Sequence, residues 1–119
     1  MKKILILCGC LFLLTACGSN EVASVEQVDC ITKNSLVSEG AILIDVRSAL
    51  EYEEGHLDKS INIAVDAIES SIESEVSDKD TKIIVYCRSG NRSATAAQTL
   101  VNMGYKNVYD LGAMNSCSN

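Results

Sequence analysis

Residues 82–103, KIIVYCRSGNRSATAAQTLVNM, decide the fold of this chain. Residues 82–86 are rich in branched apolar side chains and predict a buried strand. A short loop containing Gly90 follows. Apolar residues then recur every three or four positions over residues 93–103, which predicts an amphipathic helix that ends at Gly104. A strand that passes through a tight loop into a helix is typical of α/β proteins with a parallel sheet.

Cys87 stands between the predicted strand and the predicted helix, and three features there favour its thiolate. The start of the helix directs unpaired N–H groups and the positive end of its dipole at the loop. Gly90 allows the backbone to curl so that successive amides point inward as an anion nest. Arg88 and Arg92 bracket the loop and add positive charge. A lone buried cysteine is usually an inert apolar residue, whereas this combination predicts a nucleophile.

Strands and helices alternate along the rest of the chain. Strands are predicted over residues 25–30, 41–46, 61–64, 81–86 and 107–111, and helices over residues 32–39, 49–54, 66–76 and 93–103. Ser48 and Glu51 form a predicted capping box at the start of the second helix, which Gly55 ends. The alternation predicts an α/β fold with a small, mostly parallel sheet of about five strands and helices on both faces. Ligands bind such sheets beyond the carboxyl ends of the strands, where Cys87 lies.

The first residues have the features of a secretory signal. Two lysines precede an apolar run over residues 4–14, which is too short to span a bilayer as a mature helix. The run ends in Leu14-Thr15-Ala16-Cys17, which resembles the lipobox of bacterial lipoproteins. This resemblance implies cleavage before Cys17 and acylation of that residue. We therefore expect anchoring on the extracytoplasmic side of the cell envelope, which is the periplasmic side where two membranes are present.

The chain divides into three predicted parts: a signal peptide over residues 1–16, a lipidated tether over 17–26, and a folded domain over 27–119. Removal of the signal takes two lysines and no acidic residue, which leaves eight basic against sixteen acidic residues and a net charge of −8. Nucleic-acid binding requires a basic surface. We therefore expect no nucleic-acid partner, membrane contact only through the anchor on Cys17, and a monomer. We expect no metal ion and no cofactor.

Five ordered segments resemble the signatures of single-domain rhodaneses. They are LIDVR at 43–47, EGHL at 54–57, SINI at 60–63, VYCRSGNRS at 85–93 and MGYKNV at 103–108. The resemblance runs from about residue 25 to residue 113 and implies a rhodanese fold and sulfur transfer. The Cys87 thiolate would take sulfane sulfur from thiosulfate or a persulfide donor, and a thiol or cyanide acceptor would remove it.

The resemblance also implies roles for the loop around Cys87. The amides of Ser89, Gly90, Asn91 and Arg92 would hold the persulfide as a preorganised anion hole. Arg88 and Arg92 would bind the charged end of a small anionic donor or orient the loop.

The length of the loop favours sulfur transfer over related chemistry. Tyrosine phosphatases, cell-cycle phosphatases and arsenate reductases of this fold place five residues between the cysteine and the arginine. Four residues separate Cys87 from Arg92, and a tighter cradle suits a sulfur atom better than a tetrahedral oxyanion.

Three other polar residues of the matching segments are interpreted as structural. His56 matches a family position that is structural, and attack by a preformed thiolate needs no general base. Asp45 and Arg47 lie near a strand end as supports, with Asp45 pairing an arginine. We expect none of the three to be catalytic.

Three cysteines remain once the signal is removed and Cys17 is acylated: Cys30, Cys87 and Cys117. An odd number leaves at least one thiol free or regulated. In the rhodanese sheet the first and last strands are parallel neighbours, which implies a Cys30–Cys117 disulfide with Cys87 free.

Two alternatives remain open. If Cys117 pairs with Cys87 as a resolving thiol, the protein is an envelope thiol-redox or persulfide-reducing protein. The other alternative is a non-catalytic rhodanese-like binding module, which ranks lower because inactive relatives usually lose the loop cysteine.

Overall fold

A computed structural model describes residues 23–117 and contains a five-stranded parallel sheet in the order β1-β5-β4-β2-β3. The strands are β1 (Val25–Gln27), β2 (Ile42–Asp45), β3 (Ser60–Asn62), β4 (Lys82–Cys87) and β5 (Asn107–Ala113). The helices are α1 (Cys30–Ser38), α2 (Ala49–Glu54), α3 (Ile68–Glu75) and α4 (Asn91–Asn102), with 3₁₀ turns η1 (Val65–Ala67) and η2 (Met114–Cys117). The predicted α/β class with a parallel sheet is confirmed.

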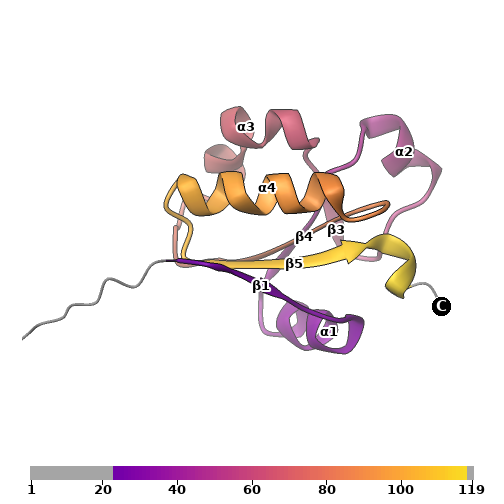
Figure 1. Ribbon diagram of the computed structural model, residues 1–119, viewed down its shortest axis with the longest axis horizontal. Helices are drawn as coiled ribbons and strands as arrows, with labels where there is room; N and C mark the ends of the chain where they lie inside the picture. Colours follow the sequence, from indigo (N-terminus) through magenta and orange to yellow (C-terminus); the bar gives the residue numbers. More distant parts are fainter. Residues whose placement is uncertain (1–22, 118–119) are drawn as a thin grey trace, which may run out of the picture.

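The sheet is covered on both faces (Figure 1), with α3 and α4 above it and α1 below in that view. β4 is its central strand, and its side chains alternate between the two layers. Val85 and Cys87 belong to the core shared with α3 and α4, whereas Ile84 and Tyr86 belong to the core shared with α1. All four are fully buried, as expected for a strand inside a parallel sheet.

The ends of several elements differ from the sequence-based expectation. Strand β1 ends at Gln27 because the side chain of Asp29 accepts the Thr32 N–H at 2.9 Å and begins α1 there. Cys30 is therefore the first residue of a helix, not the last of a strand. β1 starts at Val25, as predicted, and pairs with β5.

Helix α2 begins as the sequence predicts. The Ser48 side chain accepts the Glu51 N–H, and the Glu51 carboxylate accepts the Ser48 N–H, so both halves of the capping box are present. Gly55 follows with a φ of 149°, a value that favours glycine.

The predicted signal peptide and Cys17 lie outside the described residues. Within residues 23–117, none of the helices combines the length and the apolar character needed to cross a membrane.

Candidate active site

Cys87 ends β4 with its side chain fully buried beneath the start of α4. Its Sγ accepts two backbone N–H groups, from Gly90 at 3.0 Å and from Ser93 at 3.3 Å. Both donors belong to the loop and first turn of α4, so the positive end of that helix faces the sulfur. This arrangement stabilises negative charge on Sγ.

Gly90 gives the loop its shape. It is the residue immediately before α4 and has a φ of 103°, a conformation that side-chain-bearing residues rarely adopt. A Cβ at this position would lie 3.9 Å from the Cα of Gly112 on β5. The left-handed turn directs the Gly90 N–H back at Sγ, and the Ser93 hydroxyl donates to the Gly90 carbonyl at 3.1 Å to close the turn.

The two amides that reach Sγ differ in part from the expected set. Gly90 belongs to the four residues that the resemblance implies, but Ser93 does not. The N–H groups of Ser89, Asn91 and Arg92 belong to the same loop and first helical turn but do not bond to Sγ. Helical periodicity places Ser93 in a helix but does not indicate that its amide turns to the sulfur.

Arg92 is held by a carboxylate of α2. The Glu51 carboxylate accepts hydrogen bonds from both terminal nitrogens of Arg92, at 2.8 and 3.1 Å. This is the bidentate geometry of a strong pair. These bonds hold the pKa of Glu51 well below its usual range and raise the pKa of Arg92. Two N–H donors of Arg92 are therefore bound within the protein, which holds its guanidinium against α2.

Arg88 is arranged differently. Its side chain is 69% exposed, and its Nε lies 3.6 Å from the same Glu51 carboxylate, too far for a hydrogen bond. Of the two loop arginines, Arg88 is therefore the one that remains available to a ligand.

Asp45 and Arg47 form a buried ion pair at the end of β2, which confirms the predicted pairing of Asp45 with an arginine. The Arg47 side chain donates to both Asp45 oxygens, at 3.0 and 2.7 Å, and also to the Gly55 carbonyl at 2.7 Å. Its hydrogen bonds to the Asp45 carboxylate raise the pKa of Arg47. The pair joins the end of β2 to the end of α2.

Tyr86 supports the segment that follows α2. Its hydroxyl accepts the Leu57 N–H at 2.9 Å and lies 3.0 Å from the Ser60 hydroxyl. Burial raises the pKa of Tyr86 to about 12, so the phenol stays protonated at any physiological pH. His56 also faces this segment: its ring stacks on Tyr52 with centroids 3.7 Å apart, and Nδ1 is 2.8 Å from the Tyr52 carbonyl. These contacts fit the structural role expected for His56.

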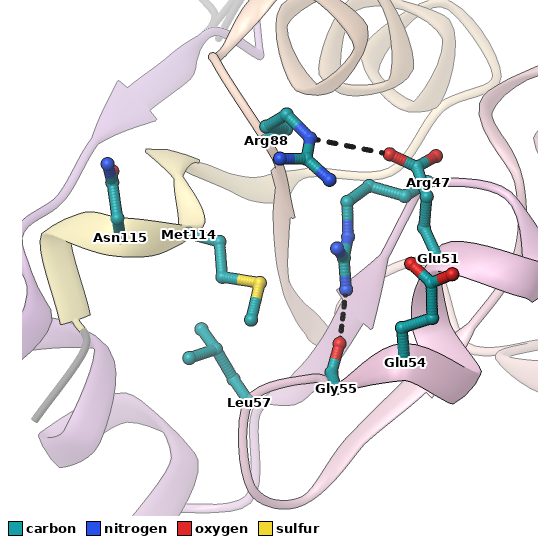
Figure 2. Close-up of a pocket in the computed structure, with 8 residues that line it drawn as sticks. All are labelled: Arg47, Glu51, Glu54, Gly55, Leu57, Arg88, Met114 and Asn115. Carbon is teal, nitrogen blue, oxygen red and sulfur yellow. Dashed lines mark hydrogen bonds and ion pairs between the residues drawn. The ribbon is translucent and has the colours of Figure 1, made fainter.

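A pocket of about 390 Å³ opens beside the Cys87 loop (Figure 2). It is bounded by the ends of β2 and β4, by α2 and the residues after it, and by η2. The lining residues are Arg47, Glu51, Glu54, Gly55, Leu57, Arg88, Met114 and Asn115. Sites in parallel sheets lie at this end of the strands. Of these eight residues, the sequence assigned Arg88 alone to a site.

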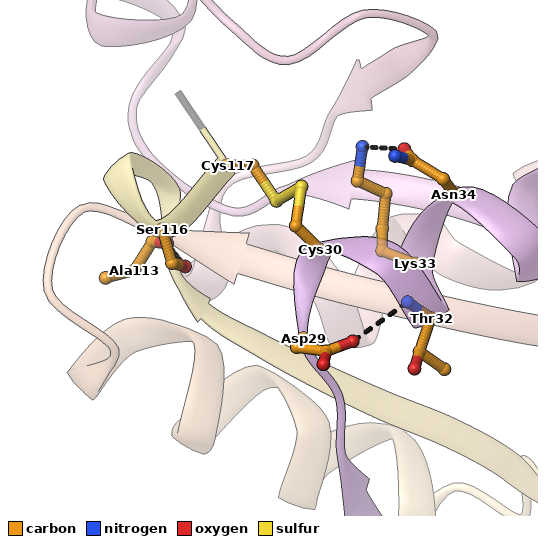
Figure 3. The surroundings of a disulfide bond; sticks show 8 residues. All are labelled: Asp29, Cys30, Thr32, Lys33, Asn34, Ala113, Ser116 and Cys117. Atoms are coloured by element: carbon orange, nitrogen blue, oxygen red, sulfur yellow. Dashed lines mark hydrogen bonds between the residues drawn. A yellow bond between two sulfur atoms is a disulfide. The ribbon is translucent and has the colours of Figure 1, made fainter. Parts of the chain in front are cut away.

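The other two cysteines of the described chain are joined in a disulfide (Figure 3). Cys30 starts α1, Cys117 ends η2, and their Cα atoms are 5.3 Å apart although 87 positions separate them. Cys117 belongs to the core on the α1 face, while Cys87 belongs to the core on the α3/α4 face. Cys87 is a free thiol, and the sheet separates it from Cys117.

Fold and site together define an α/β protein with a buried free thiol that accepts two backbone N–H groups at a strand-to-helix turn. The rhodanese-like domain family matches residues 31–116, and the chain therefore belongs to that family. It is 31% identical over 91 residues to the thiosulfate sulfurtransferase GlpE of Coxiella burnetii, covering 76% of this chain and 78% of that protein. It is 35% identical over 71 residues to the thiosulfate sulfurtransferase PspE of Escherichia coli, covering 60% and 68% respectively.

A solved structure agrees with these relatives. A rhodanese with anions from E. coli superposes with a TM-score of 0.64 at 32% identity, covering 66% of this chain and 93% of that one. Other curated relatives are much longer. The chain spans 21% of the tRNA uridine(34) hydroxylase of Erwinia tasmaniensis, to which it is 36% identical over 75 residues. Together the thiosulfate sulfurtransferase relatives support sulfur transfer as the general chemistry of the site.

Proposed function

We propose that this protein is a sulfurtransferase that carries sulfane sulfur on Cys87. The donor is thiosulfate or a persulfide, and the acceptor is a thiol or cyanide. The observation that supports this most directly is the pair of N–H groups, from Gly90 and Ser93, aimed at a buried free sulfur. A small cradle of amides favours the Cys87 thiolate as nucleophile, and it favours the persulfide anion that the thiolate forms.

The reaction has two balanced steps. The Cys87 thiolate attacks the outer sulfur of thiosulfate, the sulfur–sulfur bond of the donor breaks, and sulfite leaves with the electron pair. The acceptor then attacks the terminal sulfur of the Cys87 persulfide, and Cys87 leaves as a thiolate. No outside oxidant or reductant is consumed. The loop amides of Ser89, Asn91 and Arg92 are available to hold the terminal sulfur of the persulfide until an acceptor attacks it.

The two loop arginines have different parts in this proposal. Arg88, with an exposed guanidinium at the pocket, binds the charged end of the donor. Arg92, bound to Glu51, holds the loop in its inward-facing shape.

A redox cycle between Cys87 and Cys117 is less well supported. Cys117 is bonded to Cys30, and it packs on the face of the sheet opposite Cys87. A resolving thiol must reach the persulfide directly, which this placement does not favour. A purely non-catalytic binding module does not account for the amides aimed at Sγ.

The test is a thiosulfate:cyanide assay on the wild type, on Cys87→Ser, and on the double variant Cys30→Ser/Cys117→Ser. We expect Cys87→Ser to lose at least about a thousand-fold in turnover, since it removes the nucleophile. The double variant should keep turnover within about tenfold of the wild type. A folded wild-type protein with no turnover contradicts the proposal. Equal loss in the double variant would favour the redox alternative.

We also propose that the protein is a monomer, tethered through acylated Cys17 to the extracytoplasmic side of a membrane, without a nucleic-acid partner. The sequence before residue 18 and the acidic composition support this. Fractionation of cells that express the wild type or Cys17→Ser tests the anchor. The wild type should be found with membranes and the variant should not; membrane association of both would contradict lipidation at Cys17.

A further inference from the structure

The pocket beside the Cys87 loop has one apolar wall and one charged wall. Figure 2 shows Met114 and Leu57 pointing toward each other on one side, with Arg88 and the two glutamates of α2 on the other. Its volume of about 390 Å³ falls near the lower end of the range of small-molecule sites, about 300–1,000 Å³. Because Arg88 directly follows Cys87, a molecule in this pocket lies against the loop that holds the reactive sulfur.

Most of the charges in and beside this pocket are already matched by partners within the protein. Arg47 is bound by the buried Asp45 carboxylate. Glu51 is bound by Arg92 and lies close to Arg88. Glu54 differs from these. It is exposed, and it has no hydrogen-bond or ion-pair partner among residues 23–117. Its carboxylate is the unmatched negative charge that the pocket offers to a ligand, across from the exposed Arg88 guanidinium.

We propose that this pocket selects a small aminothiol as the sulfur acceptor. The ammonium group faces Glu54, the alkyl part packs on Met114 and Leu57, and the thiol is directed at the Cys87 loop. This inference rests on the proposed function, because it assigns the acceptor of that reaction. An uncharged thiol of the same size lacks the group that pairs with Glu54, so the arrangement favours the aminothiol over it.

The transfer step is balanced with these reactants alone. The acceptor loses its thiol proton to solvent, and its thiolate attacks the terminal sulfur of the Cys87 persulfide. The bond between that sulfur and Sγ breaks. Cys87 leaves as the thiolate that its two amide donors stabilise, and the aminothiol departs as a persulfide. The acceptor thiol is thereby oxidised to a persulfide, and the Cys87 persulfide is reduced to the thiolate.

The experiment compares two acceptors that differ only in one terminal group, cysteamine and 2-mercaptoethanol, with thiosulfate as donor and the full chain as enzyme. The measured quantity is the ratio of their kcat/KM values in the wild type, in Glu54→Gln and in Glu53→Gln. Glu53 is the matched control, because it is an exposed glutamate of the same helix that does not line the pocket. The intrinsic reactivity of each thiol cancels when the ratio is compared between variants.

We expect Glu54→Gln to lower the cysteamine preference about two- to fivefold, the strength of a solvent-exposed ion pair, and Glu53→Gln to leave it unchanged. High salt should reduce the preference in the wild type as it screens that pair. An unchanged ratio in Glu54→Gln, or an equal fall in Glu53→Gln, overturns the inference. Cyanide, which carries no ammonium group, separates the two claims. Turnover with cyanide but no effect of Glu54 rejects only the aminothiol, whereas no turnover with cyanide rejects sulfur transfer itself.

Discussion

Cys87 and the Cys30–Cys117 pair lie at the same end of the sheet but on opposite faces, and their surroundings differ completely. Cys87 is held under α4 by two amide donors and remains a free thiol. Cys117 packs in the α1-side core and joins the last turn of the described chain to the start of α1. Both side chains are buried, so the two sulfurs differ in their neighbouring backbone groups and bonding partners and not in burial. The proposed reactivity of Cys87 rests on that difference.

The largest expected effect is a difference in stability between variants of the two cysteine sites. Cys30→Ser/Cys117→Ser should lower the free energy of unfolding by about 2–5 kcal/mol, since the bond closes a loop of 87 positions. Cys87 closes no loop, so Cys87→Ser should lower the free energy of unfolding by less than about 2 kcal/mol. Urea unfolding under non-reducing conditions measures both. Equal losses would mean that the Cys30–Cys117 bond does not form in solution.

An intermediate effect is expected at Gly90. Gly90→Ala forces a side chain into a left-handed conformation, which should cost about 1–3 kcal/mol of stability and displace the amide that faces Sγ. Turnover in the thiosulfate:cyanide assay should fall more than tenfold, because the displaced amide no longer faces Sγ. Gly104→Ala is the control, because Gly104 also has a positive φ but lies at the far end of α4. Equal turnover in the two variants would contradict the cradle.

The smallest effect is a pH dependence at the Glu51–Arg92 pair. The hydrogen bonds from Arg92 hold the pKa of Glu51 well below its usual range, so it is lower in the folded than in the unfolded chain. The resulting stabilisation is full above the unfolded value of about 4.3. It is lost as the pH falls through the folded value.

The Tm of Glu51→Gln should therefore lie below that of the wild type at neutral pH, and the gap should shrink as the solution is acidified below about pH 4. Thermal unfolding followed by circular dichroism gives both values. Glu53→Gln serves as the exposed control on the same helix. A gap that stays constant with pH would show that the Glu51 carboxylate contributes through packing and not through its charge.

Local sequence signals predicted most of the fold. The branched residues before Cys87, the capping box at Ser48 and the periodic apolar positions of α4 each act within a few residues, and each gave the correct element. The ends of elements were less predictable. α1 starts at Cys30 because the side chain of Asp29 caps it. The period of the apolar residues does not indicate that the strand ends and the helix begins there.

The site was predictable only where its residues are adjacent in the sequence. Glu51 was identified through its cap to Ser48, but its pair with Arg92 joins residues 41 positions apart, and no local pattern indicates that contact. The walls of the pocket are also long-range: Met114 and Leu57 meet because η2 and the segment after α2 fold over the same strand ends. The direction of the Ser93 amide depends on the tight turn at Gly90.

The most direct test of the account is the mass of each cysteine-containing peptide after the protein is incubated with thiosulfate under non-reducing conditions. We expect one added sulfur atom on the Cys87 peptide alone, its removal by cyanide, and Cys30 and Cys117 recovered as a linked pair throughout. An unmodified Cys87 peptide, or added sulfur on Cys30 or Cys117, would contradict it.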